Sequence, residues 1–194
     1  MKRWMKIALI SLIAMGLVLG VLLAFDVISF PPFNENRTSI RDAAELVNRY
    51  PPDLMLLGED ILFQIDIPIR KLDSLTAETV RRIEGRSYSV LVIEDRKDTV
   101  RLTEEEIELI RRLIYDEGYS VFYFGTKYLS AWNGPGYSVS DPDGLCVSFT
   151  NELGRVVRTV GFWKTQSETI MKNNPYILGD TLTYQLEALI RANH

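Results

Sequence analysis

The longest hydrophobic pattern in the chain is an unbroken apolar run over residues 7–25, which has 19 residues and no charge. A helix rises about 1.5 Å per residue, so this run approaches the ~30 Å thickness of a bilayer's hydrocarbon core. Pro31 and Pro32 follow, and they end a helix because proline has no backbone N–H to donate. The pattern therefore predicts a transmembrane helix.

Charges on either side of this run predict its orientation. Lys2, Arg3 and Lys6 precede it, and the first charge after it is Asp26. Since basic flanks stay in the cytoplasm, we predict a single-pass protein of the cell membrane with a cytoplasmic N-terminus. Residues 1–33 would form the tail and anchor, and residues 34–194 an extracytoplasmic domain. The alternative is a cleaved signal peptide, whose apolar core usually has only ~7–15 residues.

Beyond the anchor, helical and strand-like patterns alternate along the chain. Helical spacing of apolar residues predicts helices over residues 40–50, 76–85, 103–112 and a terminal segment that begins near Asn174. Stretches rich in β-branched and aromatic residues predict strands over 61–69, 88–94 and 119–125, and a hairpin of 145–150 with 155–162. Residues 54–57 are all apolar, so their pattern does not distinguish a helix from a strand. Residues 126–144 have the composition of a loop.

The helix from residue 103 has the clearest local signals. Thr103 and Glu106 form a capping-box pattern, and Gly118 follows as a stop. The strands on either side, 90–93 and 121–124, are almost continuously apolar, as strands covered on both faces are. Strand, helix and strand in this order predict a parallel pair with a right-handed crossover. We therefore expect an α/β domain: a flavodoxin-like three-layer sandwich with a partly parallel sheet and a C-terminal β-hairpin plus helix.

Residues 90–95 (VLVIED) and 109–121 (LIRRLIYDEGYSV) carry a family resemblance. They resemble the opening strand–helix–strand of a response-regulator receiver domain, where an acidic pair ends the first strand and binds magnesium. The same stretch is similar to one unit of the class I amidotransferase and ThuA-like α/β folds. The resemblance implies a flavodoxin-like layer order and transfers no catalytic residue.

Composition narrows the function. From Ile7 onward the chain holds 19 Lys and Arg against 26 Asp and Glu, so it lacks the basic excess that nucleic-acid binding requires. Cys146 is the only cysteine, which excludes an intramolecular disulfide. His194 is the only histidine and the last residue, which removes the central group of Ser-His-Asp and Cys-His catalysis.

Acidic residues after the predicted strands form one candidate site. Asp66 lies near the end of the predicted strand 61–69, and Glu94, Asp95 and Asp98 lie at or after the end of the strand 88–94. Ligands of open α/β sheets bind beyond the carboxyl ends of the strands. The carboxylate oxygens could hold a divalent cation, with Lys127 meeting a phosphate. This hypothesis describes a membrane-tethered, metal-dependent phosphate-ester hydrolase. The competing interpretation is that these side chains are solvated loop charges.

Aromatic residues in the predicted loop form the second candidate site. Trp132, Tyr137 and Tyr128, with Asn133, could make a platform for an envelope glycan or an envelope protein. The competing interpretation is that the rings fasten the loop to the core. We expect a binding or interaction module of the cell envelope that is not obviously catalytic and needs no cofactor, with the hydrolase and its divalent cation as the alternative. An exposed patch around Trp132 would favour binding, and convergence of Asp66, Glu94 and Asp95 would favour the hydrolase.

Overall fold

The structure, a computed structural model, describes residues 38–83, 88–132, 144–152, 155–163 and 172–193. The predicted anchor at residues 7–25 lies outside these ranges. No helix within them combines the length and the apolar character needed to cross a membrane. Residues Ser39–His194 form one compact unit, and the fold described below is that of this unit.

The unit is built on one mixed sheet of six strands in the order β2-β1-β3-β4-β5-β6. The first four strands run parallel, and β5 is antiparallel to both β4 and β6. The strands are β1 (Asp53–Gly58), β2 (Arg70–Leu72), β3 (Ser89–Glu94), β4 (Ser120–Phe124), β5 (Gly144–Glu152) and β6 (Arg155–Trp163). The predicted parallel pair of β3 and β4 and the predicted hairpin of β5 and β6 are therefore confirmed.

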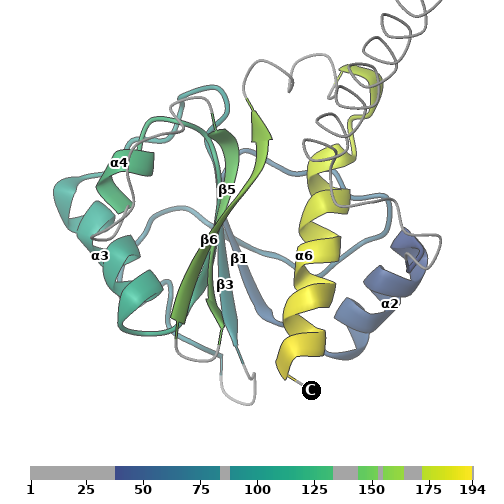
Figure 1. The fold of residues 1–194 in the computed structure, drawn as a ribbon. Coiled ribbons are helices and arrows are strands. Elements are labelled where there is room, and N and C mark those ends of the chain that lie inside the picture. Colours follow the sequence, from purple (N-terminus) through teal and green to yellow (C-terminus); the bar gives the residue numbers. More distant parts are fainter. Residues whose placement is uncertain (1–37, 84–87, 133–143, 153–154, 164–171, 194) are drawn as a thin grey trace, which may run out of the picture. The chain divides into compact units, whose positions relative to one another are not determined.

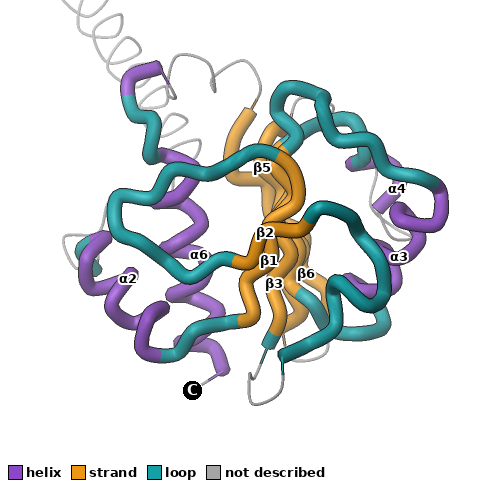
Figure 2. The backbone as a smooth tube through the Cα atoms, turned by 180° about the vertical axis from the view of Figure 1, so that it is seen from behind, coloured by secondary structure: helices purple, strands orange, loops and turns teal. Residues whose placement is uncertain are grey.

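Helices cover both faces of this sheet, so the described elements form three layers (Figures 1 and 2). One face carries α2 (Ile40–Arg49) and α6 (Ile177–Asn193), and the other carries α3 (Glu104–Tyr115) and the short α4 (Leu129–Trp132). Each face has its own cluster of buried apolar side chains. The α/β class predicted from the sequence is confirmed.

Strand β3 shows how the sequence produces these layers. Successive side chains of a strand point to opposite faces. Val90 and Val92 accordingly belong to the cluster beneath α2 and α6, while Leu91 and Ile93 belong to the cluster beneath α3. Because helices cover both faces, every side chain of β3 is buried, and the strand must be apolar without alternation.

The N-cap of α3 confirms the predicted start of that helix, whereas the helix continues to Tyr115, three residues beyond the predicted end. The Thr103 hydroxyl accepts from the backbone N–H of Glu106, and the Glu106 carboxylate accepts from the backbone N–H of Thr103 at 2.8 Å. At the other end, Gly118 adopts a φ of 69°, a left-handed conformation that glycine tolerates at little cost. The chain then turns directly into β4.

Two segments differ from the predicted elements in the residues that the structure describes. Residues 61–69, predicted as a strand, form a loop in which Ile61 and Ile67 are buried at the α2/α6 face, and the short β2 begins only at Arg70. Within the segment 76–85, predicted as a helix, the described residues 76–83 contain only a turn. The Thr79 hydroxyl donates to the backbone of Ser74 and accepts from the N–H of Thr76 at 2.8 Å, so local side-chain bonds replace helical ones.

In two further segments the structure shows an element that the sequence pattern did not predict. The ambiguous apolar run at residues 54–57 is the core of β1, a central strand of the sheet. The predicted loop from residue 126 contains α4, a single helical turn at Leu129–Trp132.

Candidate functional site

The order in which the chain adds strands to the sheet reverses between β1 and β3: β2 lies on one side of β1, and β3 and β4 lie on the other. The connection from β1 to β2 packs Ile61 and Ile67 on the α2/α6 face, whereas β3 leads into α3 on the opposite face. Such a switch point at the carboxyl ends of parallel strands is the usual ligand position in α/β sheets. Four residues meet here: Gly58 and Glu59 from β1, and Glu94 and Asp95 from β3.

Glu94 is a fully buried carboxylate at this switch point. One of its oxygens accepts a hydrogen bond from the Arg96 guanidinium, and the other, Oε2, has no hydrogen-bond partner among the described residues. Burial raises the pKa of the Glu94 carboxyl above its ordinary value, and the Arg96 guanidinium opposes part of that rise. Beside it, the more exposed Glu59 and Lys97 form an ion pair at 2.5 Å.

Asp95, the next residue, faces the other side of the sheet. Its Oδ1 accepts from the backbone N–H of Val100 at 2.8 Å, and its Oδ2 accepts from the Tyr123 hydroxyl at 3.3 Å. Both bonds fasten the loop after β3 to the α3 face. Asp98 lies exposed in that loop with a φ of 54°, and its N–H donates to the carbonyl of Asp95.

Asp66 lies at the opposite end of the strands, near the amino end of β1. Its carbonyl accepts from the Asn48 amide at 3.1 Å, and Asn48 is in the last turn of α2, which leads into the amino end of β1. Asp66, Glu94, Asp95 and Asp98 are therefore not brought together. No group of three His, Cys, Asp or Glu residues able to hold a metal ion occurs in the described part of the chain. Alternation along β3 turns Glu94 and Asp95 to opposite faces, so the structure does not assemble the predicted four-carboxylate metal site among these residues.

The described members of the predicted aromatic platform are core residues. Trp132 is fully buried, and its ring centroid lies 4.9 Å from that of Tyr123 and 5.7 Å from that of Tyr128. The Tyr128 hydroxyl donates to the carbonyl of Val100 at 3.2 Å, and Lys127 lies over the Tyr128 ring at 4.7 Å.

The expected exposed patch around Trp132 is therefore wrong for Trp132 and Tyr128, because their large rings fill the space between α4 and the sheet. Asn133 and Tyr137, the other two members, lie outside the described residues.

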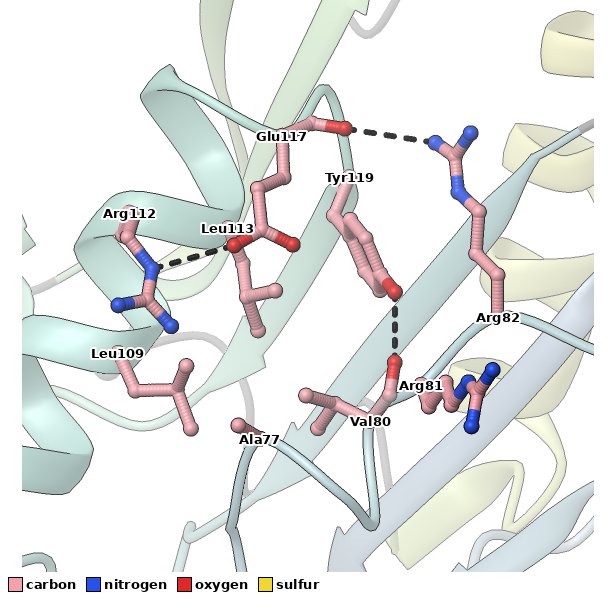
Figure 3. A pocket seen from close by; sticks show the side chains of 9 residues that line it. All are labelled: Ala77, Val80, Arg81, Arg82, Leu109, Arg112, Leu113, Glu117 and Tyr119. Carbon is pink, nitrogen blue, oxygen red and sulfur yellow. Dashed lines mark hydrogen bonds and ion pairs between the residues drawn. The ribbon is translucent and has the colours of Figure 1, made fainter.

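A pocket that the sequence did not predict lies beside α3 (Figure 3). Its volume is about 350 Å³, and its walls come from the turn before β3, the second half of α3 and the residue that precedes β4. The lining residues are Ala77, Val80, Arg81, Arg82, Leu109, Arg112, Leu113, Glu117 and Tyr119. The pocket thus combines an apolar wall with three arginines.

Hydrogen bonds fix several of these side chains (Figure 3). Tyr119 donates from its hydroxyl to the carbonyl of Val80 at 2.6 Å, and burial raises the pKa of this phenol. Arg112 pairs with the Glu117 carboxylate at 3.1 Å. Arg82 donates to the Glu117 carbonyl at 3.4 Å and lies 5.2 Å from the centre of the Tyr119 ring.

The pocket escaped sequence reasoning because its walls are far apart in the chain. Residues 77–82 reach it only because the segment turns back instead of forming the predicted helix. The signal that could have indicated it is the pair of adjacent arginines, Arg81 with Arg82, set against Arg112 on the next helix.

Comparison of the chain with protein-family models, with curated proteins and with solved structures found no match. The function is therefore argued from the site itself.

Proposed function

We propose that this chain is a membrane-anchored, extracytoplasmic binding module of the cell envelope that holds its ligand in the pocket between residues 77–82 and α3. The observation that carries the proposal is the pocket itself. Its volume of about 350 Å³ falls within the ~300–1,000 Å³ of small-molecule sites. Five of its nine lining residues are apolar or aromatic, and the other four are charged residues that can orient a ligand.

The walls are held in place before any ligand arrives. Val80, Leu113 and Tyr119 are at most 4% exposed, and they belong to the core cluster beneath α3. A pocket walled by core residues requires little ordering on binding, which lowers the entropic cost of association.

The remaining parts of the proposal rest on the chain as a whole. The order β2-β1-β3-β4 supports a flavodoxin-like layer order. The charge-free run at residues 7–25 supports a single-pass anchor with the domain outside the cytoplasm. The carboxylates invoked for a hydrolase point apart, so no observation favours that alternative.

The binding test is a thermal-shift screen of the purified full chain against sugar phosphates, nucleotides, small organic acids and envelope glycans. A ligand at a hundred times its dissociation constant adds ~2.7 kcal/mol of stability, which shifts the midpoint of a domain of this size by about 5–10 °C. We expect at least one class to produce such a shift. Absence of any shift across the panel contradicts the proposal.

Two tryptophan variants locate the binding. Ala77 is exposed at the rim of the pocket, so Ala77→Trp should fill the pocket without removing a core side chain. Ser74 is exposed nearby and does not line the pocket, so Ser74→Trp is the matched control. We expect the ligand-induced shift to disappear in the first variant and to persist in the second. A shift that survives in both places the ligand elsewhere.

The anchor has a separate test. Alkaline phosphatase fused after His194 is active only if the C-terminus lies outside the cytoplasm, and we expect activity together with retention of the chain in carbonate-washed membranes. An inactive fusion, or release of the chain from the membranes, overturns the predicted topology and leaves the pocket proposal untouched.

A further inference from the structure

We propose that the pocket selects a small organic ligand that carries one anionic group, a carboxylate or a phosphate monoester, on an apolar body. This inference rests on the proposed function and specifies the ligand class of the same pocket. It follows from the distribution of charge, from the unequal engagement of the three arginines and from the apolar side chains beside them (Figure 3).

The charge of the pocket is opposite to that of the protein. The whole chain has a net charge of −4, yet the pocket is lined by three arginines and one glutamate. Clefts lined by one sign of charge raise the local concentration of ligands of the other sign. The arginines of the pocket therefore attract an anion to this position, although the net negative charge of the chain repels it.

The three arginines are not equally available. Arg112 is paired with the Glu117 carboxylate, and Arg82 is held by the Glu117 carbonyl and the Tyr119 ring. The guanidinium of Arg81 makes no hydrogen bond or ion pair with any residue that the structure describes. Arg81, exposed at the rim, is thus the cation that can turn to an incoming anion, with Arg82 beside it. A guanidinium can donate two parallel hydrogen bonds to one carboxylate or phosphate.

The other lining residues define the rest of the ligand. Ala77, Val80, Leu109 and Leu113 form the apolar wall, which favours a hydrocarbon or aromatic body. At the α3 end, Arg112 and Glu117 neutralise each other, so among the described residues that end offers no free cation for a second anionic group on the ligand. An amphiphile with one anionic group matches this lining, whereas a polyphosphate would need further free cations.

The test measures binding of matched probes to the full chain by isothermal titration calorimetry. 4-Phenylbutyrate and phenyl phosphate carry an anion on an apolar body, 4-phenylbutyramide replaces the anion by a neutral amide, and inorganic phosphate has no apolar body. We expect the two amphiphilic anions to bind roughly tenfold or more tightly than either the amide or inorganic phosphate, since charged hydrogen bonds and apolar burial both contribute.

Variants assign the anion to Arg81. Arg81→Gln should weaken 4-phenylbutyrate roughly tenfold and leave the amide unchanged, because only the charged probe uses the guanidinium. Arg111 is the matched control: it is a neighbouring arginine on α3 that pairs with Glu108 and does not line the pocket. Arg111→Gln should change neither affinity. Higher salt should weaken the anion alone.

Each contrary outcome has a distinct meaning. Equal affinities for butyrate and amide, blocked by Ala77→Trp and unaffected by Arg81→Gln, overturn the anionic ligand class and leave the proposed function standing. Inorganic phosphate binding as well as phenyl phosphate overturns the apolar half of the inference. Binding of no probe overturns the inference, and if the wider screen is also silent, the proposed function fails with it.

Discussion

Replacing Trp132 by alanine tests whether this ring is a structural element of the core or a surface for ligands. The side chain is fully buried, and it contacts the rings of Tyr123 edge-on and Tyr128 at a tilt. Truncating a buried tryptophan costs about 3–5 kcal/mol, from lost apolar burial and from the cavity left behind. For a domain of this size the midpoint should fall by about 6–20 °C.

Phenylalanine at the same position separates two contributions. The Trp132 indole N–H is buried and has no hydrogen-bond partner in the part of the chain that the structure describes, so removing it relieves a desolvation cost of about 1–3 kcal/mol. Trp132→Phe should therefore lose only about 1–2 kcal/mol, because this relief offsets part of the volume deficit. The assay is urea unfolding of the full chain followed by circular dichroism, with the slope against urea compared among variants.

Tyr176→Ala is the control for the assay, because Tyr176 is an exposed aromatic residue, and its loss should change stability by less than ~0.5 kcal/mol. A Trp132→Ala variant within ~1 kcal/mol of the natural chain would refute the reasoning. The ring would then not be part of the cooperative core, and a role in an exposed aromatic platform would regain its basis.

Three further predictions concern the carboxyl ends of β1 and β3 and the start of α3. Gly58→Ala should lose at least ~1–3 kcal/mol in urea unfolding, because Gly58 has a φ of 101° and a Cβ there would collide with the Glu94 carbonyl; a neutral result contradicts this. The raised pKa of Glu94 means that the folded chain keeps this proton above pH 4.5, so stability from this group falls as pH rises through the folded pKa. The stability of Glu94→Gln relative to the natural chain should therefore increase from pH 4.5 upward, and a constant or decreasing difference contradicts that sign. Thr103→Ala should cost about 0.5–2 kcal/mol through loss of its bond to Glu106, measured in the same way, whereas an unchanged stability would show the cap to be dispensable.

Local sequence alone was enough for the elements whose signals lie within one turn or one strand. The capping box at Thr103, the apolar stripe of α3 and the apolar runs of β3 and β4 predicted their structure correctly. In α3, residues within one turn supply the capping hydrogen bonds and the period of 3.6. In β3 and β4, the signal is a continuous run of apolar residues, which is typical of a strand covered on both faces. The parallel pairing of β3 and β4 followed as well, because a helix between two covered strands permits few other arrangements.

Tertiary structure decided the features that depend on distant partners. Trp132 is buried because α4 and the sheet enclose it, and the sequence around it reads equally well as an exposed loop. Glu94 and Asp95 are neighbours in sequence, yet the pleat of β3 sends them to opposite faces. The arginine-lined pocket exists only because residues 77–82 turn back toward α3, where Arg81 and Arg112, 31 positions apart in the chain, line one cavity. Periodicity reports which face a side chain occupies, whereas the identity of its neighbour on that face is determined only when the chain packs.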